Sequence, residues 1–162
     1  MLLVWLGSGI APLLVIATVL WGCHEYQRRH EAGRIVRAIE AKDETELSML
    51  LVERTDFHSV REWFGETALI VAIKSADSGG TAFAEAAVRL FVLHGANVNE
   101  PGTEWKTPLI HAAAIGKWEL CATLLAHGAD PTARDMVGRT ASDSAQGEGY
   151  VRIASLLRRV ES

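Results

Sequence analysis

Histidine is the residue type of this chain best suited to bind a metal ion, and the sequence contains six histidines. Two of them, His94 and His127, each stand directly before a Gly-Ala pair and occupy equivalent places in two similar segments. If the two segments are copies of one stacked unit, equivalent positions lie ~8–10 Å apart, whereas zinc needs each ligand at ~2 Å. No His-x-x-x-His or Cys-x-x-Cys pair occurs. We therefore expect no metal site and a structural role for the histidines, His111 included.

Other residues that could carry catalysis do not form a recognisable constellation. The sequence lacks the motifs of nucleophilic catalysis and the glycine loops that bind phosphate or dinucleotides. The acidic pair Glu44 and Glu46 is typical of a solvated helix face. Cys23 and Cys121 provide no disulfide framework, and we interpret both as structural. We predict a protein that is not an enzyme, with no cofactor and no small-molecule substrate.

The stronger signal is an internal repeat with a period of ~33 residues. Thr107 and Thr140 are separated by this period, as are Gly95 and Gly128. The step from Thr67 to Thr107 exceeds the period by seven positions. These extra positions belong to a Ser- and Gly-containing insertion (residues 74–84), which we interpret as a longer turn between two helices. The sequence assigns no role to this insertion.

The recurring residues have physical reasons for their positions. Thr107 can cap a helix whose first residue is Pro108, where a missing N–H costs little. Gly116 allows a sharp turn between two helices, and Gly128 ends the second helix. Three leucines give that second helix an apolar face: Leu120, Leu124 and Leu125.

The period, together with the segments TPLIHAA (107–113) and GAD (128–130), resembles the ankyrin repeat. This resemblance implies an all-α repeat fold, an α-solenoid of about four stacked helix–turn–helix units. It also implies that the chain holds a protein partner.

The ankyrin repeat domain is predicted over residues 34–162. Its units are a capping repeat (34–64), a repeat with the insertion (65–105), a further repeat (106–138) and a C-terminal capping repeat (139–162). Terminal repeats of such arrays turn a polar face to water. We therefore expect Ser142, in a slot where internal repeats usually carry Leu, to face solvent.

Residues 1–23 carry no charged side chain and have the length of a transmembrane helix. Trp5 and Trp21 lie near the two ends, where indoles favour the headgroup layer, and Pro12 could kink the helix. We predict a single-pass membrane anchor, followed by a juxtamembrane linker over residues 24–33. The alternative is a lipoprotein, because Leu-Trp-Gly-Cys (20–23) resembles a lipoprotein cleavage box.

Charge gives the orientation and excludes one class of partner. Four arginines follow the apolar segment directly: Arg28, Arg29, Arg34 and Arg37. The positive-inside rule then predicts cytoplasmic repeats, the alternative being an anchor with the repeats in the periplasm. Residues 43–162 carry eleven basic and seventeen acidic side chains. This acidic balance argues against nucleic acid as a partner.

Exposed aromatic residues are the best candidates for partner binding. Trp105 stands where the next repeat has the turn glycine Gly138, and tryptophan is enriched at interface hot spots. The flanking Glu104 and Lys106 belong to the same candidate site. Trp63 and Trp118 are further candidates, although all three indoles could instead pack within the array.

These observations predict a membrane-anchored protein that mediates protein–protein interaction. We expect the partner to be membrane-associated, with the chain acting as an accessory or assembly subunit of a membrane complex. The alternative is a regulatory inhibitor, such as an immunity-like protein that caps an enzyme or a toxin.

Overall fold

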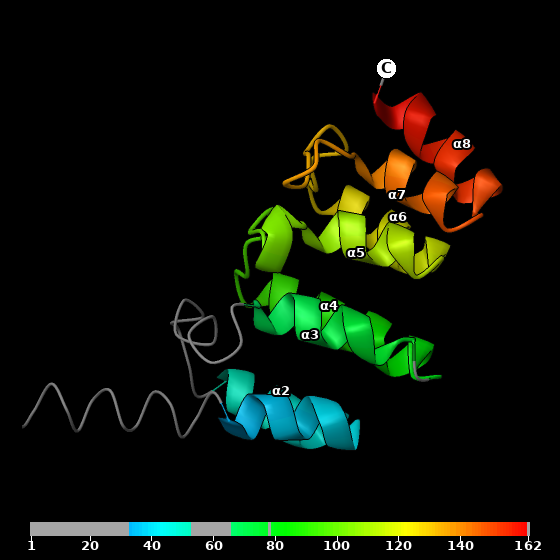
Figure 1. Cartoon of the computed structure of the whole chain (residues 1–162). Helices are drawn as coiled ribbons and strands as arrows, with labels where there is room; N and C mark the ends of the chain where they lie inside the picture. The colour runs from blue at the N-terminus through cyan, green and yellow to red at the C-terminus, as the bar shows by residue number, and fades with distance from the viewer. Residues whose placement is uncertain (1–32, 53–65, 78, 162) are drawn as a thin grey trace, which may run out of the picture.

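The computed structural model describes residues 33–52, 66–77 and 79–161. Within these ranges every regular element is a helix (Figure 1). Residues 33–41 are helical and are followed by α2 (Glu44–Val52). The next helices form three consecutive pairs: α3 (Ala68–Ser75) with α4 (Thr81–Leu93), α5 (Pro108–Ala114) with α6 (Trp118–Ala126), and α7 (Ala141–Gly147) with α8 (Val151–Glu161). A short 3₁₀ helix, η2 (Thr103–Trp105), lies between α4 and α5.

The pairs stack on one another as the repeat period predicts. Helices α3, α5 and α7 pack in one row, and α4 packs between α2 and α6 in a second row. Small side chains allow this close approach, because Ala72, Ala112, Ala113 and Ala145 are completely buried. Leu120 and Leu124 are also fully buried, while Leu125 is partly exposed. The core is therefore a continuous layer that passes through all the pairs.

Local hydrogen bonds begin the helices where the sequence predicts. The hydroxyls of Thr67 and Thr107 accept from the backbone N–H groups of Ile70 and Ile110, at 3.2 and 3.4 Å. Pro108 is the first residue of α5. Gly116 has φ 72° in the turn between α5 and α6, a left-handed conformation that favours glycine.

The insertion contributes mostly to a helix. Helix α3 is one residue longer than α5, the turn that follows is two residues longer, and α4 has 13 residues against 9 in α6. The expectation of a longer turn therefore accounts for only two of the seven extra residues. The remainder extends the helices themselves.

One expectation about the C-terminal repeat is wrong. Ser142 is only 2% exposed and does not face water. Its hydroxyl donates to Glu161 Oε2 at 3.1 Å and lies 2.9 Å from the hydroxyl of Thr140. Ser142 can be buried because Glu161, the last residue of α8 (Val151–Glu161), accepts its hydrogen bond.

No helix in the described part of the chain is long and apolar enough to cross a membrane. The predicted anchor, with Trp5, Pro12 and Trp21, lies outside the described residues, as does nearly all of the predicted linker.

Candidate protein-interaction surface

Two loops at equivalent sequence positions lie along one side of the helix stack (Figure 1). We call residues 102–106 the first tip loop and residues 135–139 the second tip loop; the two occupy equivalent places in successive repeats. Both close by a backbone hydrogen bond between equivalent residues. Gly102 donates to the Lys106 carbonyl at 2.9 Å, and Asp135 donates to the Arg139 carbonyl at 3.0 Å. The N–H of Met136 donates to the Glu104 carbonyl at 3.0 Å and ties the loops together.

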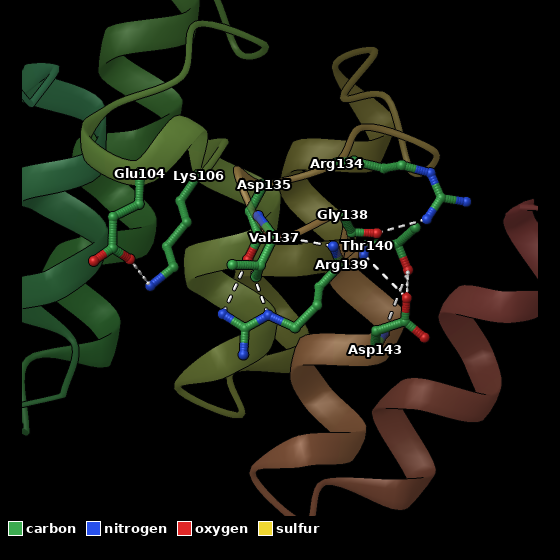
Figure 2. Close-up of polar contacts among 9 residues, drawn as sticks. All are labelled: Glu104, Lys106, Arg134, Asp135, Val137, Gly138, Arg139, Thr140 and Asp143. Atoms are coloured by element: carbon green, nitrogen blue, oxygen red, sulfur yellow. Dashed lines mark hydrogen bonds and ion pairs between the residues drawn. The ribbon is translucent and has the colours of Figure 1, made fainter.

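A buried carboxylate holds the second tip loop (Figure 2). The side chain of Asp135 is 1% exposed. Its Oδ1 accepts from the N–H groups of Val137 and Arg139 at 3.0 and 2.9 Å, and its Oδ2 accepts from Arg139 Nε at 3.0 Å. Burial alone would raise the pKa of Asp135, but these hydrogen bonds and the Arg139 charge outweigh it and hold the pKa below its usual value. Gly138, with φ 82°, completes the turn.

The first tip loop lacks both of these features. Gly102 replaces the aspartate, and Trp105 replaces the glycine. Glu104 and Trp105 nevertheless adopt left-handed backbone conformations, with φ 57° and 59°. Such a conformation costs a non-glycine residue roughly 1–2 kcal/mol.

A residue from the beginning of the same repeat (65–105) stabilises this loop. Glu66 is 9% exposed. Its Oε1 accepts from the hydroxyl of Thr103 at 2.9 Å and from Lys74 Nζ at 2.5 Å. Burial alone would raise the pKa of Glu66, but the hydrogen bonds from Lys74 and Thr103, together with the charges of Lys74 and His111, outweigh burial and hold the pKa below its usual value. The two tip loops thus close with equivalent backbone hydrogen bonds, but their conformations differ, because Glu104 has φ 57° whereas the equivalent Val137 has no positive φ. Different side chains hold each loop.

The tip loops expose large apolar side chains beside their charged ones. Trp105 is 71% exposed, Met136 67% and Val137 68%. We call these three residues the tip patch. The backbone bond between Met136 and Glu104 joins the two loops that carry the tip patch. The sequence points to Trp105 through its replacement of a glycine. Met136 and Val137 were not predicted, although their position directly before Gly138 was the available signal.

Charged groups surround the tip patch, and most are paired. Glu104 Oε2 lies 2.6 Å from Lys106 Nζ, and Asp135 Oδ2 lies 3.0 Å from Arg139 Nη2. The hydrogen bond from Lys106, followed by its charge, lowers the pKa of Glu104. Arg134 Nη1 donates to the Gly138 carbonyl at 2.6 Å (Figure 2). No carboxylate within the described ranges pairs with Arg134.

The other tryptophans predicted for this surface differ from Trp105. Trp118 is the first residue of α6 and is partly buried against the core. Its indole therefore has a packing role that the Trp105 indole lacks. Trp63 lies outside the described residues. Of the two candidate tryptophans in the described part of the chain, only Trp105 belongs to the tip patch, and Glu104 and Lys106 are its neighbours in the sequence.

Two buried groups elsewhere could suggest chemistry, and each has a simple explanation. Burial, and then the charge of Lys74, lowers the pKa of His111 to about 4, so the ring is neutral near pH 7. Its Nε2 has no hydrogen-bond partner among the described atoms. Burial raises the pKa of the Cys121 thiol to about 12, so the thiolate needed for nucleophilic attack does not form near pH 7. No three His, Cys, Asp or Glu side chains group as metal ligands in the described part of the chain.

Comparisons with known proteins agree with the repeat architecture. The sequence profile of a family described as ankyrin repeats, in three copies, matches residues 35–135. The human espin-like protein is 46% identical over 54 residues, which are 33% of this chain. The matched segment is 5% of that protein's length, so this chain corresponds to a small part of its relative.

Proposed function

We propose that this chain, which belongs to the ankyrin repeat family, holds a protein partner on the tip-loop side of its stack, next to a membrane. In this proposal the chain carries out no catalysis. It acts as an accessory or assembly subunit that positions its partner through a rigid surface.

The observation that carries the proposal is the conformation and exposure of Trp105. A tryptophan at φ 59° costs roughly 1–2 kcal/mol relative to glycine, which the second tip loop uses at the same position. The indole is 71% exposed, so burial in the array recovers little of this cost. A large side chain that does not help the fold is best explained by contact with a partner, because tryptophan is enriched at interface hot spots.

The membrane part of the proposal rests on sequence. Residues 1–23 are uncharged and long enough to span a hydrocarbon core. Arginines follow them at positions 28, 29, 34 and 37, and basic residues of this kind favour the cytoplasmic side. An anchor would raise the effective concentration of the repeats near a membrane partner.

Co-purification of the tagged full-length chain from membranes in mild detergent tests the proposal. We expect one protein to co-purify specifically and to be lost with Trp105→Ala. Leu93→Ala is the matched control: Leu93 is 78% exposed but lies at the end of α4, so the partner should be retained.

A second variant separates the anchor from the repeats. In this variant a polyleucine segment replaces residues 1–23. Retention of the partner would assign recognition to the repeats, and loss would assign it to the apolar segment. Capture of a soluble enzyme whose activity falls on binding would instead favour the inhibitor alternative. The absence of any specific partner would contradict the proposal.

A further inference from the structure

We infer that the tip patch and Arg134 together bind a partner segment in which a carboxylate lies beside a large apolar side chain. This inference rests on the proposed function and identifies the chemistry of the segment that is held. The apolar side chain contacts Trp105, Met136 and Val137, and the carboxylate binds the Arg134 guanidinium.

The apolar half of the site comes from two loops that are tied together. Trp105 lies on the first tip loop, while Met136 and Val137 lie on the second, and the Met136 N–H bonds to the Glu104 carbonyl at 3.0 Å. All three side chains are about two-thirds or more exposed. An indole offers a broad apolar face, and a thioether adapts its shape to what it contacts. Such a surface suits one large aliphatic or aromatic side chain.

The charged half of the proposed site is identified by asking which charged side chains near the patch already form ion pairs. Glu104 pairs with Lys106, and the buried Asp135 pairs with Arg139. Their charges therefore largely cancel within the loops. Arg134 is exposed, and no carboxylate within the described ranges pairs with it. Among the described residues, Arg134 therefore adds one positive charge without a carboxylate partner directly before the second tip loop, although the sequence from residue 43 onwards is acidic overall.

The geometry of Arg134 leaves the edge that binds carboxylates accessible. Nη1 donates to the carbonyl of Gly138, the residue directly after Val137. This bond holds the guanidinium against the end of the second tip loop, and in Figure 2 the guanidinium lies on the other side of Gly138 from Val137. In Figure 2 the other terminal nitrogen points away from the residues drawn. The Nε and Nη2 edge can therefore form the two parallel hydrogen bonds with which arginine binds a carboxylate.

A membrane surface fits the same site less well. Binding of anionic lipid headgroups generally uses a cluster of about four to eight basic residues. Beside the tip patch only Arg134 lacks a carboxylate partner among the described residues, since Lys106 and Arg139 are in ion pairs. A partner segment with one carboxylate beside an apolar side chain fits a site with one arginine and an apolar patch better than a lipid surface does.

Selection from a displayed library of random dodecapeptides on the full-length chain in detergent tests the inference. We expect the enriched peptides to place Asp or Glu next to a large apolar residue. Their binding should weaken about tenfold or more with Trp105→Ala, as for an interface hot spot, and with Arg134→Gln, as for loss of a charge-assisted hydrogen bond. Arg134→Glu should reverse the selection toward Lys or Arg beside the apolar residue.

The matched control is Arg152→Glu, which makes the same charge change at an exposed position of α8. Peptide affinity should be unchanged in this variant. Circular dichroism and thermal unfolding establish that each variant is folded. If Arg134→Glu does not fold, Arg134→Gln alone carries the test of Arg134.

Four results would overturn the inference. The first is enriched peptides that lack acidic residues, or that bind Arg134→Gln and Arg152→Glu equally well. The second is failure to enrich any peptide that depends on Trp105, even where a protein partner co-purifies. The third is Trp105-dependent binding to phosphatidylserine vesicles, which would assign the patch to lipid. The fourth is Trp105-dependent self-association of the chain, which would assign it to a second copy.

Discussion

Asp135 and Gly102 occupy equivalent positions, yet only one of them has a side chain that can hold its loop. Asp135 receives three hydrogen bonds while almost completely buried. In the first tip loop the equivalent stabilisation comes from Glu66, through the hydroxyl of Thr103. One carboxylate therefore stabilises each of the two loops that carry the tip patch.

We expect Asp135→Ala to lower the free energy of unfolding by about 2–3 kcal/mol, because it removes the buried, charged acceptor of three hydrogen bonds. Urea denaturation followed by circular dichroism measures this. The matched control is Asp130→Ala, since Asp130 is exposed and accepts hydrogen bonds from the nearby Thr132 at 2.8 and 2.7 Å. A loss below about 1 kcal/mol is expected there. Equal losses in the two variants would contradict the role given to Asp135.

His111 leads to a prediction about acid stability. Its pKa is lowered to about 4 in the folded chain, against ~6.5 in an unfolded chain. The unfolded state therefore takes up a proton first, so the stabilising contribution is complete above pH ~6.5 and is lost as the pH falls from there toward 4. The ring is partly solvated, so this loss should be less than about 1.4 kcal/mol per pH unit.

The variant His111→Asn removes this titration. Between pH 7 and pH 5 its free energy of unfolding should fall less than that of the native chain. The same denaturation series at the two pH values measures the difference. An identical fall in both proteins would show that His111 does not titrate differently on unfolding.

Helix beginnings were the features most accessible from sequence, because their determinants are local. A threonine hydroxyl reaches a backbone N–H only three positions away, as Thr67 and Thr107 do. The sequence could not predict how the seven extra residues divide between the turn and the helices. Whether such a residue joins the turn or extends α4 depends on the packing of α4 against α2 and α6. The burial of Ser142 was missed because its partner, Glu161, belongs to a different helix and is distant in the sequence.

The caps of α5 and α7 should differ in strength. Thr140 and Asp143 form a reciprocal capping box, with Asp143 N–H to Thr140 Oγ1 at 3.3 Å and Thr140 N–H to Asp143 Oδ2 at 3.1 Å. The Thr107 hydroxyl makes one longer bond of 3.4 Å. We expect Thr140→Ala to cost about 1–2 kcal/mol and Thr107→Ala about 0.5–1 kcal/mol. Thermal and urea unfolding give this order, and the opposite order would show that capping does not limit α7.

At the scale of the whole molecule, the stack turns loops from separate repeats into one surface. Trp105 alone was predictable, since the repeat period shows that it replaces a glycine. The placing of Trp105 on a loop that is joined to the loop of Met136 and Val137 depends on the stacking of adjacent repeats and on a backbone bond between their loops. Neither is visible in a sequence pattern. Likewise, the lack of a carboxylate partner for Arg134 within the described ranges emerges only when neighbouring charges are placed and paired.

The most direct test is the free energy of unfolding of the full-length chain with alanine and then glycine at position 105. Because the indole is exposed, Trp105→Ala should change stability by less than about 0.5 kcal/mol. Because φ is 59°, Trp105→Gly should be more stable than Trp105→Ala by about 1 kcal/mol. Gly138→Ala is the matched control; it should lose a similar amount, since φ is 82° and an added Cβ meets no atom within 4 Å. A loss with Trp105→Ala as large as that of a buried aromatic side chain, about 3 kcal/mol or more, would show that the indole stabilises the array and would contradict its assignment to a partner.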